Sequence, residues 1–203
     1  MFKYNGIPFE KLSWLLKYYD DPTNGIPITS GIYYWVYYPE FDPNLISNSD
    51  LIQLLETYSK KLLRHKEELK GTYKFIAEIK EQGFRDTGEL FGLSPSKGAL
   101  LKNFLSLNIS NKGLFKTFFT ELCFSRPFYI GKANNLRDRL SNKHFKRIDS
   151  TLLSDIDDEA IDYTDIWIGH KAIPILSTGN HLNVIFEEIL SRTIKPGLTK
   201  KPN

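Results

Sequence analysis

The segment RPFYIGKANNLRDRLSNKHF, residues 126–145, joins a short apolar run to a dense cluster of basic side chains. Residues 128–130 predict a β-strand, Gly131 predicts a turn, and the two asparagines that follow predict the start of a helix ending near Phe145. The polar side chains directly behind the strand are Lys132, Arg137, Arg139 and His144. A packed core requires none of these groups, whereas an anionic partner would bind them. The segment therefore predicts a strand–turn–helix unit that binds an anion.

A second strand is predicted far upstream, over GIYYWVYY at 31–38, because the run is rich in aromatic and β-branched residues and stops at Pro39. Its Tyr33, Trp35 and Tyr37 alternate onto one face. The other expected elements are helices near 9–19, 49–69, 100–107, 114–122 and 183–193, and a strand within 163–176. Residues 72–82 fit a strand or a helix by periodicity, and residues 84–98 predict a loop.

The long helix expected over 49–69 carries an apolar stripe with a seven-residue repeat, interrupted by His65. The stripe consists of Leu51, Leu55, Tyr58, Leu62 and Leu69. Such a stripe forms either a seam with a second helix or a second copy of the chain, or the face that a helix turns to its own core.

Composition is typical of a folded protein. The 203 residues are 41% hydrophobic and 14% aromatic, which is enough for one large domain, or one domain with a sizeable insertion, to bury a core. Cys123 is the single cysteine, which excludes an internal disulfide and a cysteine metal cluster and favours a reducing compartment. No apolar run is long enough to cross a bilayer, and the first residues lack a signal-peptide core. These features predict a soluble, cytoplasmic protein without a membrane partner.

The net charge is only +3, but the charges are unevenly distributed. Residues 126–150 carry seven Lys or Arg and two Asp, whereas residues 151–168 carry six acidic residues and no basic one. Adjacent segments of opposite sign predict one face that attracts a polyanion and one that repels it. Charge runs alone more often mark two solvated faces, so this pattern has two interpretations.

The last predicted helix contains Glu187 and Glu188 within the apolar sequence VIFEEIL. A carboxylate in a helix that is apolar on most of its circumference lies near the core, where an unpaired charge is unfavourable. A metal ion or a basic side chain beside the carboxylate would offset that penalty.

Four stretches together resemble the GIY-YIG nuclease superfamily: GIY at 31–33, YIG at 129–131, KANNLRDR at 132–139, and the Glu-bearing helix followed by KPGL. That superfamily includes repair-type nucleases, homing endonucleases and some type II restriction enzymes. The resemblance implies an α+β core with a small mixed or antiparallel three-stranded sheet flanked by helices. It assigns residues 30–38 and 127–203 to this core, 1–29 to an N-terminal helical extension, and 39–126 to a mostly helical insertion that binds DNA or a partner.

The resemblance also implies roles for individual residues. Tyr33 and Tyr129 flank the site on adjacent strands, and Arg139 matches the family's helix arginine. Lys132 matches a lysine that directly follows YIG in several branches of the family. Glu187 matches the metal-binding glutamate, because a proline lies nine residues beyond it.

Two positions depart from the family pattern. Restriction-type members carry a histidine four residues after the arginine, where this chain has Lys143, with His144 next to it. The family's asparagine, three residues after the proline, is replaced by Thr199, and Asn203 could substitute for it if the terminus folds back.

These residues are suited to phosphodiester hydrolysis. A Mg²⁺ or Mn²⁺ ion on Glu187 would polarise the phosphate, and Arg139 can donate two hydrogen bonds to it. Tyr33 is expected to be the general base, its pKa lowered by Lys132, Arg139 and the metal, while Tyr129 orients the water or a phosphate oxygen. The basic residues expected to bind DNA are Lys132, Arg137, Lys143, Lys146 and Arg147.

The predicted function is therefore a metal-dependent, site-specific DNA endonuclease of the restriction or phage-defence type. The 95 residues between Tyr33 and Tyr129 form an insertion large enough to bind DNA or a partner. One site per chain cuts one strand, so double-strand cleavage predicts a homodimer, or membership of a larger defence complex. Two alternatives stay open: a structure-selective repair nuclease with the same site, and a DNA- or partner-binding module that has lost catalysis.

Overall fold

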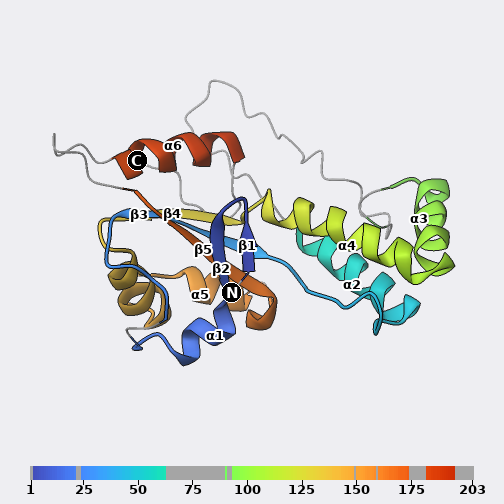
Figure 1. Ribbon diagram of the computed structural model, residues 1–203, viewed down its shortest axis with the longest axis horizontal. Helices are drawn as coiled ribbons and strands as arrows, with labels where there is room; N and C mark the ends of the chain where they lie inside the picture. The colour runs from blue at the N-terminus through green and yellow to red at the C-terminus, as the bar shows by residue number, and fades with distance from the viewer. Residues whose placement is uncertain are drawn as a thin grey trace, which may run out of the picture. The chain divides into compact units, whose positions relative to one another are not determined.

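The computed structural model describes residues 2–21, 24–62, 90, 93–148, 150–158, 160–173 and 182–194. The chain forms two compact units, one made of residues 1–39 and 120–203, the other of residues 40–119. The expected α+β class is confirmed, because an antiparallel sheet and separate helices make up the described residues (Figure 1). The segment 72–82 and the positions Thr199 and Asn203 lie outside the described residues.

The first unit is built on an antiparallel sheet of five described strands, in the order β1-β2-β5-β3-β4. The strands are β1 (Phe2–Tyr4), β2 (Ile7–Lys11), β3 (Gly31–Tyr37), β4 (Tyr129–Ala133) and β5 (Ile166–Ala172). In the middle of β3, Tyr33 pairs with Gly131 of β4 on one side and with His170 of β5 on the other. The GIY and YIG tripeptides therefore lie on neighbouring strands, and the expected three-stranded sheet is extended by the β1–β2 hairpin.

The N-terminus differs from the helical extension expected for residues 1–29. It begins with the β1–β2 hairpin, and helix α1 (Leu12–Lys17) is shorter than the helix expected over 9–19. The hairpin turns at Asn5 and Gly6, whose φ angles of 48° and 77° are left-handed, as in two-residue hairpin turns. The expectation of a helix from residue 9 is wrong because β2 pairs with β5 before the helical periodicity begins.

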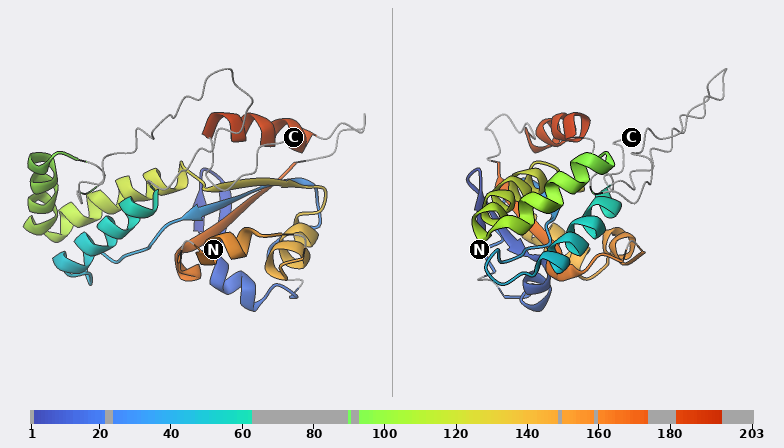
Figure 2. Two further views of the ribbon diagram at one scale, coloured as in Figure 1. Left: turned by 180° about the vertical axis from the view of Figure 1, so that it is seen from behind. Right: turned by 90° about the vertical axis from the view of Figure 1, so that its right-hand side faces the viewer.

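Different helices cover the two faces of this sheet (Figures 1 and 2). One face, which we call the tyrosine face, carries Tyr33 and Trp35 and packs against α1, the π-helix η2 (Asp138–Phe145) and α5 (Leu152–Asp158). The opposite face, the α6 face, carries Ile32 and Ile130 and packs against α6 (Leu182–Ile194). A short 3-10 turn, η3 (Tyr163–Asp165), leads into β5.

The second unit is helical in its described part and lies within the insertion expected at 39–126. It contains α2 (Asn48–Leu62), α3 (Pro95–Leu107) and the first part of α4 (Ile109–Phe124). Leu51, Leu55 and Tyr58 of α2 are buried, and the Tyr58 ring lies 4.7 Å from that of Phe119. This part of the apolar stripe of α2 therefore faces its own core.

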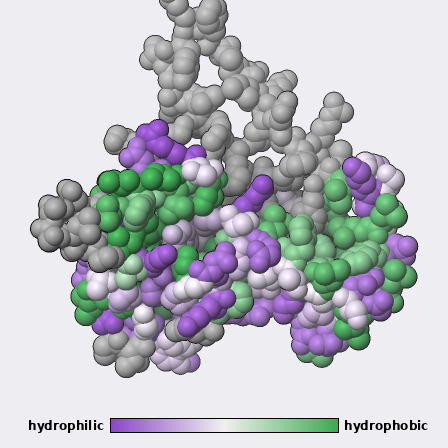
Figure 3. Space-filling model, turned by 45° about the horizontal axis from the view of Figure 1, so that its top comes forward, coloured by the Kyte–Doolittle hydropathy of each residue, from purple (hydrophilic) through white to green (hydrophobic). Residues whose placement is uncertain are grey.

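Each unit exposes a hydrophobic patch, and both patches can be seen in Figure 3. One covers the outer side of α6 and consists of Val184, Ile185, Phe186 and Ile189; the other lies on the second unit and includes Leu100, Leu107, Leu114 and Phe118. Exposed apolar patches of this kind often mark contact surfaces. Among the described helices, none is both long enough and apolar enough to cross a membrane.

Candidate active site

Four of the predicted site residues meet around the hydroxyl group of Tyr33 on the tyrosine face. The Nε2 atom of His144 lies 2.8 Å from this oxygen, and Nε of Arg139 donates a hydrogen bond to it at 3.3 Å. The Tyr129 ring lies 6.0 Å from the Tyr33 ring and 5.8 Å from the His144 imidazole. We call Tyr33, Tyr129, Arg139 and His144 the tyrosine cluster. Two neighbouring strands and one helix therefore bring together residues that are up to 111 positions apart.

The glycines of the two tripeptides leave space for this cluster. A Cβ atom on Gly131 would lie 2.3 Å from Cζ of Tyr33 and 2.4 Å from its hydroxyl oxygen. A Cβ atom on Gly31 would lie 2.4 Å from the carbonyl oxygen of Lys171 and 2.6 Å from a methyl group of Leu136. Gly131 therefore lets the Tyr33 ring extend across β4, and Gly31 lets the start of the Arg139-bearing helix approach the sheet.

The π-helical form of η2 brings His144 to the same oxygen as Arg139. Residues four apart share a face in an α-helix, but a π-helix has i→i+5 hydrogen bonds, so residues five apart share a face. One such bond joins the N–H of Ile148 to the carbonyl of Lys143 at 2.8 Å. His144, five residues after Arg139, consequently contacts Tyr33, although the family spacing points to Lys143.

Burial dominates the electrostatics of the cluster. The Tyr33 side chain is 0% exposed, and this burial raises its pKa far above the ordinary value, more than the hydrogen bond and charge of Arg139 lower it. Burial and then the charge of Arg139 lower the pKa of His144 to about 3, so its imidazole is neutral at pH 7. Arg139 therefore lowers the pKa of Tyr33 as expected, but burial outweighs it and the net shift is upward.

Glu187 and Lys132 lie apart from the cluster, on the α6 face. Lys132 follows Gly131 on β4 and points to the opposite face of the sheet, because side chains alternate along a strand. Its Nζ atom lies 3.3 Å from Oε2 of Glu187, which is 8% exposed. Lys132 is thus the basic partner that the buried carboxylate requires. The structure does not bring Glu187 to the phenol groups of Tyr33 and Tyr129.

The carboxylate of Glu187 is a suitable ligand for a divalent cation, but it lies on the opposite face of the sheet from the tyrosine cluster. Its Oε2 atom accepts no hydrogen bond from the described residues, and Mg²⁺ binds carboxylate oxygens while keeping several waters. Within the described part of the chain, no group of three or more His, Cys, Asp or Glu could hold a metal. A cation here would therefore depend on Glu187, with water and phosphate oxygens as further ligands.

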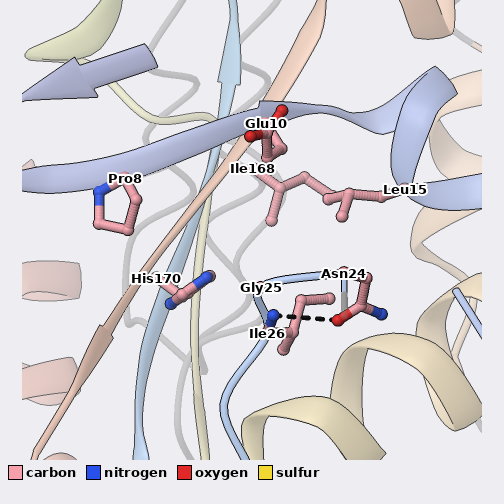
Figure 4. Close-up of a pocket in the computed structure, with 8 residues that line it drawn as sticks. All are labelled: Pro8, Glu10, Leu15, Asn24, Gly25, Ile26, Ile168 and His170. Atoms are coloured by element: carbon pink, nitrogen blue, oxygen red, sulfur yellow. Dashed lines mark hydrogen bonds between the residues drawn. The ribbon is translucent and has the colours of Figure 1, made fainter. Parts of the chain in front are cut away.

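A small pocket opens on the tyrosine face beside His170, the cross-strand partner of Tyr33 (Figure 4). Its lining residues are Pro8, Glu10, Leu15, Asn24, Gly25, Ile26, Ile168 and His170. Oδ1 of Asn24 accepts a hydrogen bond from the N–H of Ile26 at 3.0 Å, and Nε of Arg137 donates to the carbonyl of Ile26 at 2.9 Å. Arg137, expected to bind DNA, therefore fastens this loop to the helix that carries Arg139.

The other basic residues expected to contact DNA lie on or near η2. Lys143 is half-buried, and Lys146 forms an ion pair with Asp20 at 3.4 Å. Arg147 forms an ion pair with Asp157 at 2.8 Å, which joins the basic segment to the acidic one. Both ion pairs are exposed to solvent, so each contributes little to stability and can exchange its partner for a phosphate.

Two neighbours of the cluster are missing from the sequence prediction. His170 lies directly opposite Tyr33, and burial lowers its pKa. The alternation of Ile166, Ile168 and His170 along the predicted strand could have placed it on the tyrosine face. Ser150 lies 2.6 Å from Nδ1 of His144, and no pattern in the sequence marks it.

Comparison with known proteins identifies no relative. The chain matches no family model, no curated protein and no solved structure. The resemblance to GIY-YIG nucleases therefore depends on the motif residues and on where the chain places them.

Proposed function

We propose that this chain is a GIY-YIG-type endonuclease that hydrolyses phosphodiester bonds in DNA. The observation that carries the proposal is the tyrosine cluster, in which Arg139 and His144 both contact the hydroxyl group of Tyr33. The cluster joins a permanent cation, which can bind a phosphate, to groups that can pass on a proton.

Arg139 and Tyr129 are the partly exposed members of the cluster, so an incoming phosphate would meet them first. Arg139 would bind the phosphate and stabilise the negative charge that develops on it during attack. Tyr129 would orient the attacking water or a phosphate oxygen.

Tyr33 can act as a base only if its own proton leaves, because burial disfavours a free phenolate. The neutral imidazole of His144, 2.8 Å away, is the proposed acceptor. As the water oxygen bonds to phosphorus, one water proton moves to the Tyr33 oxygen and the Tyr33 proton moves to Nε2 of His144. The bond to the 3′ oxygen breaks, and this oxygen takes a proton from solvent.

The proposal includes Mg²⁺ or Mn²⁺ held by Glu187. Such an ion would lie on the α6 face, so it would supply Lewis-acid stabilisation only to a phosphate that reaches that face. In the chain itself Lys132 neutralises Glu187, so an added cation competes with this ion pair.

A catalytically inactive DNA- or partner-binding module is the second candidate. Two observations favour it: the Tyr33 side chain is fully buried, and Glu187 lies on the other face of the sheet. In such a module the cluster would stabilise the fold, and Arg139 would bind phosphate without catalysis.

The finer part of the proposal is a site-specific nuclease of the restriction or phage-defence type, in which residues 40–119 select the DNA. A structure-selective repair nuclease would use the same cluster on a different DNA form. We also propose that the chain acts as a homodimer, alone or in a larger defence complex, and the exposed apolar patch on α6 supports this. The variant Phe186→Asp should then lower the molar mass in solution, whereas Phe118→Asp, in the second unit, should not.

The deciding experiment incubates the purified chain with supercoiled plasmid, flap and branched DNA, each with MgCl₂, with MnCl₂ and with EDTA. A site-specific nuclease cuts plasmid at defined positions in the presence of metal, and a repair nuclease prefers flaps or branches. DNA binding without cleavage of any substrate would reject the nuclease and leave the inactive module.

A further inference from the structure

A line of hydrogen-bonding groups continues beyond the tyrosine cluster. Oγ of Ser150 lies 2.6 Å from Nδ1 of His144, whose Nε2 lies 2.8 Å from the hydroxyl oxygen of Tyr33. Ser150 is half-buried in the segment between η2 and α5, and its Oγ also accepts a long hydrogen bond, 3.4 Å, from the N–H of Leu152. Both ring nitrogens of a buried imidazole are therefore engaged by one partner each.

A neutral imidazole carries one N–H and one bare nitrogen, and the hydrogen bond at one nitrogen decides the state of the other. Arg139 can only donate, so the Tyr33 oxygen accepts its N–H at 3.3 Å. If Nε2 of His144 also carried a hydrogen, three hydrogens would crowd around one phenol oxygen. With a bare Nε2, only the hydrogens of Tyr33 and Arg139 lie at this oxygen. The positive charge of Arg139 also stabilises the negative partial charge of the bare nitrogen.

With Nε2 bare, the hydrogen is on Nδ1 and requires an acceptor. The Ser150 hydroxyl oxygen is in place at 2.6 Å, and it can accept from both Nδ1 and the N–H of Leu152. The titratable or charged groups that contact the imidazole among the described residues are Tyr33 of β3, Tyr129 of β4 and Arg139 of η2.

We propose that Ser150 is a positioning residue that holds His144 in the tautomer with hydrogen on Nδ1, which leaves Nε2 free to take the proton of Tyr33. The inference rests on the proposed nuclease function and adds the residue that sets the direction of proton transfer. Ser150 itself touches no reacting atom and acts through His144.

The test that does not depend on cleavage is nitrogen NMR of the intact chain labelled with ¹⁵N-histidine, because protonated and bare ring nitrogens have well-separated shifts. The His144 signals are those lost in His144→Gln. In the wild type, Nδ1 should be protonated and Nε2 bare. Ser150→Ala should move the population toward the opposite tautomer, and Ser150→Thr, which keeps the hydroxyl group, should restore the wild-type signals.

Ser141→Ala is the matched control, since Ser141 is a buried serine on η2 whose hydroxyl has no hydrogen-bond partner among the described residues. It should leave the His144 signals unchanged. A wild-type spectrum with hydrogen on Nε2, or a Ser150→Ala spectrum identical to that of the wild type, would overturn the inference.

The second measurement is plasmid cleavage by the same variants. Ser150→Ala should lower kcat at least about tenfold with an unchanged KM, as expected when part of an acid–base contribution is lost, and Ser150→Thr should restore it. Equal kcat values for Ser150→Ala and the wild type would refute the catalytic part. If the wild type cleaves no DNA, the nuclease proposal fails by itself, and the NMR result still decides the tautomer that Ser150 holds.

Discussion

The two faces of the sheet hold the two halves of the predicted site in different ways. On the tyrosine face, Arg139 and His144 converge on one oxygen atom, and Gly131 is required for the Tyr33 ring to lie there. On the α6 face, Lys132 and Glu187 form a single ion pair at 3.3 Å. One half is a network of several partners, whereas the other is a pair.

The difference shows what a motif in consecutive residues can and cannot specify. YIGK is continuous in sequence, but side chains one position apart on a strand point to opposite faces. Tyr129 and Lys132 are therefore separated by the strand itself. Substitutions on each face then reveal whether one reaction uses both halves or only the tyrosine cluster.

The largest effect is expected for Arg139→Ala. The variant should cleave plasmid at least about 10²-fold more slowly than the wild type, the usual loss when a group that stabilises transition-state charge is removed. Arg192→Ala is the control, because Arg192 is an exposed arginine of the first unit paired with Glu188. Wild-type rates for Arg139→Ala would remove Arg139 from the mechanism and, with it, the observation on which the nuclease proposal depends.

Glu187→Gln tests the other face and should lower cleavage by about 10²-fold if the carboxylate holds the metal, since metal stabilisation of phosphate charge is lost. The rate should not recover at high magnesium concentration. Glu188→Gln, one residue further on and partly exposed, is the control. If Glu187→Gln cleaves normally while Arg139→Ala is inactive, the site is confined to the tyrosine face and the Lys132–Glu187 pair is structural.

Gly131→Ala and Gly169→Ala compare the same clash on opposite faces. A Cβ atom at either position would lie 2.3 Å from an aromatic ring atom, of Tyr33 in one case and of Phe9 in the other. Overpacking of this kind destabilises a fold by about 1–3 kcal/mol, which thermal unfolding of each variant can measure. Only Gly131→Ala should also lower the cleavage rate, by about tenfold, because it displaces the phenol. Equal loss of cleavage in both variants would mean that stability alone controls the rate.

The strands β3, β4 and β5 and the last helix were predictable from sequence. The stop at Pro39 and the alternation of aromatic residues locate β3, and the apolar run before Gly131 locates the start of β4. The turn expected at Gly131 is wrong, because β4 pairs with β3 through Gly131 as far as Ala133. The proximity of Tyr33 and Tyr129 follows once both tripeptides are placed on paired strands. These are local patterns, and the tertiary structure keeps them.

Other features depend on information that periodicity does not carry. The turn at Asn5 and Gly6 has a hairpin signal, but the leucine spacing of α1 just behind it favours extending the helix too far. No sequence period distinguishes a π-helix from an α-helix over two turns, so the contact between His144 and Tyr33 appears only in three dimensions. Strand alternation could have placed Lys132 on the face opposite Tyr129. The unbroken YIGK motif instead suggested that these side chains lie on one face.

The smallest expected effect is on stability at mildly acidic pH. The pKa of His144 is about 3 in the folded chain, against an ordinary value of 6.5. Between these values the unfolded chain binds a proton at this histidine and the folded chain does not, so the unfolding free energy falls as the pH falls. Between about pH 7 and about pH 5.5 the loss from His144 should be about 1 kcal/mol.

Chemical denaturation of the wild type and of His144→Gln at both pH values isolates this term. The pKa of His170 is also lowered, and His170 is present in both chains, so its contribution cancels in the difference. The wild type should lose about 1 kcal/mol more than the variant on acidification. If the wild type and His144→Gln lost the same unfolding free energy, His144 would bind a proton as readily in the folded chain as in the unfolded chain. Its contacts with Tyr33 and Arg139 would then differ from those in the tyrosine cluster, and His144 could not be the neutral acceptor that this face of the sheet requires for catalysis.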